Sequence, residues 1–132
     1  MGKIFEINTK KDIQDLLSNY KVVVIDQYAD WCYPCKVLHP KLVELANIYS
    51  SSDLIFAKCN AETKLMEPKG LPTIDFYYNG AIYHTILGGD LKQIEQTLQK
   101  ISPLEKTDNT QIQRYKSKNS GGDYKNYGKY WQ

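Results

Sequence analysis

A Cys-x-x-Cys motif lies between a β-branched run and a helical pattern, and this junction limits the folds that the chain can adopt. Residues 22–25 (Val-Val-Val-Ile) predict a buried strand, and residues 31–36 (Trp-Cys-Tyr-Pro-Cys-Lys) follow shortly after it. A strand that leads into a helix directs unpaired backbone N–H groups and the positive end of the helix dipole at the side chain placed there. Cys32 would hold that position, where a thiol ionises more easily, and Cys35 would lie about one helical turn away. The pair therefore predicts a reversible dithiol–disulfide switch.

Two other interpretations of the motif are open at the level of sequence. The same cysteines could bind zinc together with His39, which follows one helical turn after Cys35. A structural zinc site takes four protein ligands, and the sequence offers no identifiable fourth ligand. The cysteine pair could also be inert. We favour the redox interpretation, and we expect His39 to be an ordinary residue of the helix surface.

Strand and helix patterns alternate along the rest of the chain. Period-two and β-branched runs predict strands at residues 4–7, 22–28, 54–59, 73–78 and 81–87. Apolar spacing and capping residues predict helices at about residues 9–19, 37–49 and 90–101. Residues 61–69 leave room for one or two helical turns, and Asn79-Gly80 predicts a tight hairpin. This order predicts an α/β fold, in which parallel βαβ units and an antiparallel hairpin share one mixed sheet with helices on both faces.

Length and charge indicate one domain followed by a polar tail. A chain of 132 residues can bury one full core, which we assign to residues 1–103. Residues 104–132 are rich in Lys, Asn, Gly and Tyr and poor in aliphatic side chains, so we expect them to be disordered. Residues 1–101 hold 11 Lys and no Arg against 12 Asp and Glu, which argues against binding of nucleic acid by the domain. Such binding would involve the tail, and we favour a solvated tail without that role.

Cysteine usage and the N-terminal sequence bear on the compartment. Three cysteines are too few for a framework of structural disulfides. Residues 1–6 lack the apolar core of a signal peptide, and no run approaches the length that crosses a membrane. We therefore expect a protein of a reducing compartment, the cytoplasm. Cys59 is expected to be a buried spectator thiol, because it alternates with Lys58 along its strand and points to the opposite face.

Several separated motifs together resemble the thioredoxin family. They cover roughly residues 3–101 and comprise Val24-Ile25-Asp26, the stretch from Ala29 to Lys36, Pro40, Ala57-Lys58, Gly70-Leu71-Pro72-Thr73, Asn79-Gly80 and Gly88. A Cys-x-x-Cys pair alone is not specific, whereas this ordered set is. The resemblance implies the thioredoxin fold and a protein-disulfide reductase that needs no metal and no organic cofactor.

The resemblance implies a role for both cysteines and for two residues near them. Cys32 would attack a substrate disulfide, Cys35 would resolve the mixed disulfide, and the two would form the redox disulfide Cys32–Cys35. Asp26 is a carboxylate inside an apolar strand, where desolvation raises the pKa and makes it a candidate proton acceptor for Cys35. Lys58 would be its neighbour across the sheet. The alternative for Asp26 is a capped or exposed carboxylate at the end of the strand.

The resemblance also implies a substrate-binding surface around the motif. This surface comprises Trp31, Tyr33, Pro34, Leu71, Pro72 and Gly88. Leu71-Pro72 matches the family's cis-proline loop, and Trp31 would be a rigid wall beside the cysteines or part of the core. The family usually has glycine where Tyr33 stands, and the segment between Lys58 and Pro72 is shorter than usual. These two departures leave the chemistry in place and affect the choice of partners.

The combined prediction is a thiol–disulfide oxidoreductase that reduces protein disulfides, a role in electron transport and cell redox homeostasis. We expect a monomer that receives electrons from a thioredoxin-reductase-like donor and makes no membrane contact. Pro34 resembles the residue of the reducing members of the family. One alternative is a disulfide oxidase or isomerase, favoured if Tyr33 destabilises the disulfide. Another is a binding module that uses the groove at Leu71-Pro72 and the tail, with the redox pair incidental.

Overall fold

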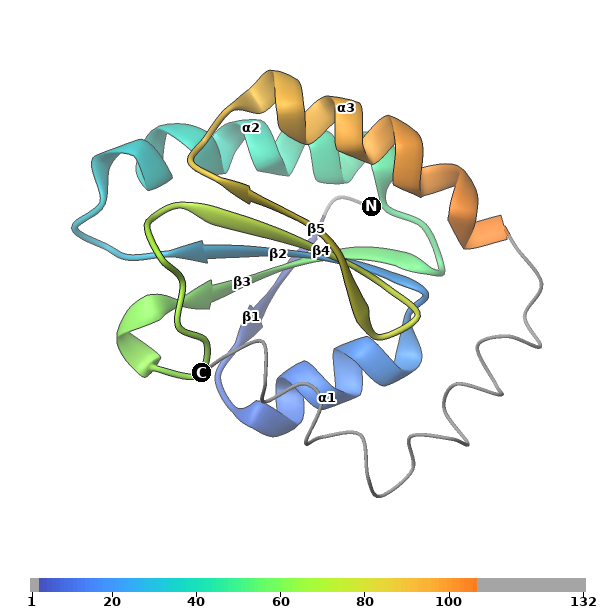
Figure 1. Ribbon diagram of the computed structural model, residues 1–132, viewed down its shortest axis with the longest axis horizontal. Coiled ribbons are helices and arrows are strands. Elements are labelled where there is room, and N and C mark those ends of the chain that lie inside the picture. Colours follow the sequence, from blue (N-terminus) through green and yellow to red (C-terminus); the bar gives the residue numbers. More distant parts are fainter. Residues whose placement is uncertain (1–2, 107–132) are drawn as a thin grey trace.

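The computed structural model describes residues 3–106, and five strands in this range form one mixed sheet (Figure 1). In the order in which they lie in the sheet, the strands are β1 (Ile4–Ile7), β3 (Leu54–Asn60), β2 (Val22–Tyr28), β4 (Thr73–Tyr78) and β5 (Ala81–Leu87). β1 and β2 run parallel to β3, whereas β4 is antiparallel to both β2 and β5. The predicted α/β fold with a mixed sheet is confirmed, and the strand bounds agree to within one residue.

Helices cover both faces of this sheet. The helices are α1 (Lys10–Asn19), α2 (Tyr33–Tyr49) and α3 (Leu91–Ile101). α1 lies on one face, and α2 and α3 lie together on the other (Figure 1). Along β2, Val22 and Val24 pack in the core under α2 and α3, whereas Val23 and Ile25 pack in the core over α1. Because both faces of β2 are covered, consecutive positions of this strand are apolar.

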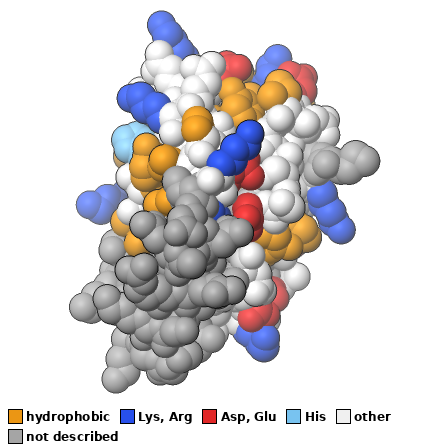
Figure 2. All heavy atoms as spheres, turned by 90° about the vertical axis from the view of Figure 1, so that its right-hand side faces the viewer, with side chains coloured by type: hydrophobic (Ala, Val, Ile, Leu, Met, Phe, Trp, Pro, Cys, Tyr) orange, Lys and Arg blue, Asp and Glu red, His pale blue; other side chains and the backbone are white. Residues whose placement is uncertain are grey.

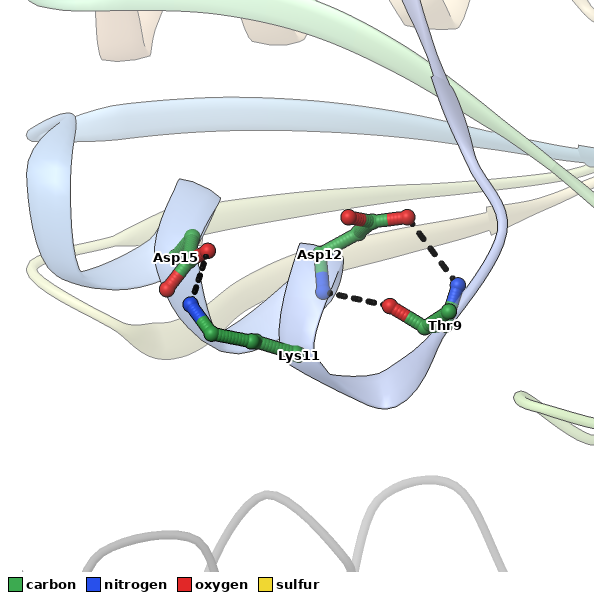
Figure 3. Close-up of polar contacts among 4 residues, drawn as sticks. All are labelled: Thr9, Lys11, Asp12 and Asp15. Atoms are coloured by element: carbon green, nitrogen blue, oxygen red, sulfur yellow. Dashed lines mark hydrogen bonds and ion pairs between the residues drawn. The ribbon is translucent and has the colours of Figure 1, made fainter.

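The start of α1 illustrates how local sequence specifies a helix end. Thr9 Oγ1 accepts a hydrogen bond from the N–H of Asp12 at 3.1 Å, and Asp12 Oδ2 accepts one from the N–H of Thr9 at 3.0 Å (Figure 3). This reciprocal capping box satisfies backbone donors that have no partner inside the helix, and it confirms the predicted cap. Lys11 and Asp15, one turn apart, form an exposed ion pair at 2.8 Å (Figure 3).

The hairpin between β4 and β5 turns at Asn79 and Gly80, as predicted. Their φ angles are 52° and 82°, so both residues lie in the left-handed region that a two-residue hairpin turn of this hand requires. Glycine adopts this conformation without strain, and asparagine tolerates it better than most side chains. The turn therefore follows from the dipeptide itself.

The β3–β4 connection and the end of α3 refine two predicted boundaries. The connection holds a single short turn, η1 (Ala61–Thr63), at the lower end of the predicted range. After α3, the 3₁₀ segment η2 (Ser102–Lys106) continues the folded part beyond residue 103. Leu104 packs against the core under α2 and α3, and Ser51 is hydrogen bonded to Glu105. Residues 104–106, which we assigned to the tail, are therefore part of the folded domain. Residues 107–132, the rest of the predicted tail, lie outside the described residues.

Charged side chains of both signs are interspersed on the described part of the face shown in Figure 2. Basic, acidic and apolar side chains alternate there over short distances. This mixed surface agrees with the near balance of Lys against Asp and Glu in residues 1–101. Its charges therefore form no extended basic patch that would attract a polyanion to the described part of this face.

Candidate active site

Cys32 is the N-cap residue of α2, where the chain enters the helix after β2. Its Sγ accepts a hydrogen bond from the backbone N–H of Cys35 at 3.3 Å. Pro34 lies in the first turn, where the missing N–H removes no helical hydrogen bond. A disulfide joins Cys32 and Cys35, whose Cα atoms are 5.3 Å apart. Once the disulfide is reduced, the N–H donor and the helix dipole stabilise a thiolate at Cys32.

A pocket of about 230 Å³ opens beside the disulfide. It is lined by Asp26, Tyr28, Ala29, Asp30, Cys35, Lys36, His39 and Lys58. The structure thus brings Asp26, Lys58 and Cys35 to one cavity. His39, which we expected on the helix surface, is half-buried and also lines this open cavity. It follows Cys35 by four positions, and side chains at that spacing share one helix face, which is the sequence signal for its place.

Asp26 is buried, with 4% of its surface exposed. Its register neighbours are Lys58 on β3 and the fully buried Ile74 on β4. Burial disfavours the charged form and raises the pKa of Asp26 from 3.8 to about 7, and the charge of Lys58 opposes part of this shift. Asp26 Oδ1 has no hydrogen-bond partner among residues 3–106. This carboxyl can gain or lose a proton near neutral pH, and the alternative of an exposed carboxylate at the strand end is wrong.

Lys58 forms its ion pair with Glu6 of β1. Lys58 Nζ lies 3.5 Å from Glu6 Oε1, and the hydroxyl of Tyr28 donates a hydrogen bond to Glu6 Oε2 at 3.0 Å. The ammonium also lies 5.5 Å from the centre of the Tyr28 ring, within the range of a cation–π contact. Burial and the bond to Glu6 raise the pKa of Tyr28, so its hydroxyl stays a donor. Sequence analysis did not identify Glu6, because this contact depends on the pairing of two strands far apart in the chain.

Trp31 and Tyr33 flank Cys32 and are exposed, at 69% and 74% of their surfaces. The indole N–H of Trp31 donates a hydrogen bond to Glu62 Oε2 at 3.0 Å, which ties the ring to η1. The alternative that Trp31 is part of the core is therefore wrong. Both rings present apolar surface beside a disulfide whose own atoms are nearly buried.

The Leu71–Pro72 peptide bond is cis, as the resemblance implied. Leu71 packs against the small cluster that contains both cysteines. The carbonyl of Pro72 accepts a hydrogen bond from the N–H of Gly88 at 2.7 Å. Gly88 has a φ of 100°, a conformation that side chains other than glycine rarely adopt. The loop before β4 and the residue after β5 are thus joined next to the disulfide.

Cys59 lies away from the disulfide, and the described residues offer no ligand set for the zinc alternative. Cys59 is 1% exposed in the core over α1, and burial raises the pKa of its thiol, as suits a spectator. Within residues 3–106, no three His, Cys, Asp or Glu side chains gather as metal ligands would. The sulfur atoms of the two cysteines considered as zinc ligands are joined in the disulfide.

Within residues 3–106, no helix has the length and apolar character needed to span a membrane.

Known proteins are similar to this chain in sequence and in fold. The family model described as Thioredoxin matches residues 4–100. Thioredoxin-T of Drosophila melanogaster is 33% identical over 74% of this chain, which spans 66% of that relative, slightly under two thirds. Thioredoxin of Neurospora crassa is 31% identical, and the alignment covers 76% of this chain and 87% of the relative. Among solved structures, mitochondrial thioredoxin 3 of Saccharomyces cerevisiae in its oxidised form has a TM-score of 0.67 at 27% identity, over 74% of this chain and 94% of that one. The predicted thioredoxin fold is thereby confirmed.

Proposed function

Since this chain belongs to the thioredoxin family, we propose that it is a thiol–disulfide oxidoreductase that reduces protein disulfides through Cys32 and Cys35. One observation carries the proposal: the disulfide lies at the N-terminus of α2, next to a buried carboxyl that titrates near neutral pH. The helix terminus favours the thiolate that attacks. The carboxyl supplies the acceptor that the second thiol needs.

The proposed reaction begins with the reduced protein. The thiolate of Cys32 attacks one sulfur of the substrate disulfide, which forms a mixed disulfide and releases the other substrate sulfur as a thiolate that takes up a proton. Cys35 then gives its proton to Asp26, and its thiolate attacks Cys32 Sγ. The Cys32–Cys35 disulfide forms, and the second substrate thiolate leaves and is protonated. Two electrons and two protons pass to the substrate, and the sulfurs alone carry the electrons, so the exchange calls for no metal or organic cofactor.

The surface around the motif is the proposed docking site for the substrate. Trp31 and Tyr33 supply exposed aromatic area, and Pro34 shapes the first turn of α2. Leu71 packs against the disulfide cluster, and the hydrogen bond from the Gly88 N–H to the Pro72 carbonyl supports the loop. A protein chain lying across this surface would have its disulfide close to Cys32. Lys58 belongs to the proton-transfer side of the site, through its charge on Asp26.

Partners and compartment follow from the redox cycle. Each turnover leaves the protein oxidised, so an electron donor of the thioredoxin-reductase type must restore the dithiol. A reducing compartment is needed, and we propose the cytoplasm and a monomeric protein that uses this cycle in electron transport and redox homeostasis. A solved neighbour is mitochondrial, so cell fractionation is the test of the compartment.

Reduction of insulin disulfides with dithiothreitol as electron donor tests the proposed function. The wild-type protein should accelerate the reduction, and Cys32→Ser should abolish the acceleration because the attacking thiol is gone. Cys59→Ser is the matched control, since it removes a buried cysteine outside the site, and it should keep the wild-type rate. Acceleration that persists in Cys32→Ser would refute the assigned chemistry. Wild-type protein that binds substrate without reducing it would favour a binding module.

The direction of the exchange needs its own measurement. Tyr33 is exposed between the cysteines, where the family usually has glycine, and this specific difference keeps an oxidase or isomerase as the second candidate. Equilibration with glutathione buffers gives the reduction potential of the Cys32–Cys35 pair. A potential below that of the glutathione buffer of the cytoplasm supports a reductase. A potential well above it supports the oxidase or isomerase.

A further inference from the structure

Three charged side chains lie in one row across the face of the sheet that α2 covers. The parallel register pairs Glu6 of β1 with Lys58 of β3, and Lys58 with Asp26 of β2. On the far side of Asp26 the row continues with the buried Ile74 of β4. Lys58 therefore lies between two carboxylates, the buried Asp26 and the exposed Glu6, and its single ammonium group can pair closely with only one of them.

The contacts of Lys58 favour the outer carboxylate. Its ammonium is paired with Glu6 at 3.5 Å, and within residues 3–106 this is the only ion pair that Lys58 forms. Tyr28 holds the same glutamate through its hydroxyl and offers its ring to the ammonium. Asp26 Oδ1, in contrast, has no hydrogen-bond partner in residues 3–106. The charge of Lys58 acts on the Asp26 carboxyl through space and lowers its pKa.

We propose that Glu6, held by Tyr28, is a positioning residue that draws the ammonium of Lys58 toward β1 and so leaves the Asp26 carboxyl free to take up the proton of Cys35. The role rests on the proposed disulfide exchange, in which Cys35 must lose a proton before it attacks Cys32. A direct ion pair between Lys58 and Asp26 would hold the carboxyl ionised and make it a weaker base. Glu6 prevents that pair by competing for the same cation.

Other ionisable groups also face Asp26 and must be kept constant in a test. Asp30 lies in the loop after β2, and Lys36 and His39 come from α2; all three line the same pocket. Cys35 lies in the pocket too, and it is held in the disulfide in the oxidised protein. Substitutions at Glu6, Lys58 and Tyr28 leave each of these groups in place. A difference in the Asp26 midpoint between such a variant and the wild type can therefore be attributed to the row of Glu6, Lys58 and Asp26.

The test is an NMR titration of the Asp26 side-chain carboxyl in the oxidised protein. Glu6→Gln keeps the size of the side chain and removes its charge, so Lys58 is released toward Asp26 and the midpoint should fall by about one pH unit. Lys58→Met removes the cation, so the midpoint should rise. Tyr28→Phe removes only the hydroxyl that holds Glu6 and should produce a smaller fall. Asp15→Asn is the matched control: it neutralises an exposed, ion-paired carboxylate on α1, across the sheet, and should leave the midpoint unchanged.

The direction of the shift decides the proposal. A midpoint that rises in Glu6→Gln would mean that Glu6 holds Lys58 close to Asp26, and a midpoint that does not move would mean that Glu6 has no effect; either result overturns the inference. The kinetic readout is the pH dependence of the resolving step, which should move to lower pH in Glu6→Gln by the same amount as the midpoint. If the wild-type protein reduces no disulfide, the proposed function falls, while the titration still decides the position of Lys58.

Discussion

Asp26 and Asp75 are both carboxylates buried in the central strands, and they lie on opposite faces of the sheet. Asp26 lies on the side of α2, and Asp75, the register neighbour of Ile25, lies on the side of α1. They are 4% and 6% exposed, and each lines a pocket, of about 230 and 260 Å³ respectively. Burial and access to a cavity therefore do not distinguish them.

Their partners do distinguish them. Asp75 accepts hydrogen bonds from the Gln27 side-chain amide at 2.6 Å and from the Thr85 hydroxyl at 2.7 Å, one on each oxygen. Burial raises its pKa and these two donors oppose part of the shift. Asp26 has an unpartnered oxygen and a cation whose ion pair is with another carboxylate. A carboxyl held by neutral donors on both oxygens serves the structure, whereas one with a free oxygen beside a thiol can exchange a proton.

The largest effect is expected on stability at alkaline pH. The pKa of Asp26 is about 7 in the folded protein and near 3.8 unfolded, so its contribution is fully present below about pH 4 and is lost as the pH rises through 7. Asp26→Asn removes this loss. The variant should be as stable as the wild type near pH 4. Above pH 8 its free energy of unfolding should be higher than that of the wild type by at most about 4 kcal/mol. Urea denaturation at several pH values measures this, and a pH-independent difference would contradict it.

The next effect is on the second chemical step. Asp26→Asn should slow release of the reduced substrate about a hundredfold, since a positioned base contributes at least that much, and should spare the first attack by Cys32. Mixed disulfide should accumulate and be visible by mass spectrometry after acid quenching. Equal slowing of both steps would show that Asp26 supports the site as a whole. Asp75→Asn is the control at the other buried carboxyl and should release substrate at the wild-type rate.

A substitution at Asp75 should have the opposite profile. Asp75→Ala leaves the Gln27 amide and the Thr85 hydroxyl without their acceptor, which should reduce the free energy of unfolding by about 1–3 kcal/mol. The rate of insulin reduction per folded molecule should not change. Denaturation curves and initial rates on the same samples measure both quantities. A lower rate at full folding would give Asp75 a part in the chemistry and remove the contrast with Asp26.

The smallest effect is expected from loss of the single hydrogen bond between Thr85 and Asp75. Thr85→Val keeps the shape of the side chain and removes one donor to Asp75, which should reduce the free energy of unfolding by about 1 kcal/mol. Because a donor that stabilises the carboxylate is lost, the pKa of Asp75 should rise further. A carboxyl NMR titration follows this, with the Asp26 midpoint as an internal reference that should stay constant.

The candidate site was predictable only in part. The helix-terminal cysteines, the buried position of Asp26 and the loop at Pro72 follow from motifs that are contiguous in the chain. Glu6 and the hydrogen-bonded Asp75 carried no such motif. Asp26 and Asp75 are both single carboxylates within apolar strands, but only Asp26 belongs to a family motif, and neither residue's partners could be foreseen from the sequence.

The sequence by itself determined the elements and most of their ends, because capping boxes, hairpin dipeptides and apolar periodicity act between residues close along the chain. Thr9 with Asp12, and Asn79 with Gly80, are of this kind, and so is Cys32 at the start of α2. Only the tertiary structure decided which charges meet. The register of β1 on β3 sets Glu6 beside Lys58, and that of β4 on β2 and β5 places Asp75 within reach of its two donors. Register depends on how whole faces of the sheet are buried, and the resulting contacts join residues whose separation in sequence carries no local signal.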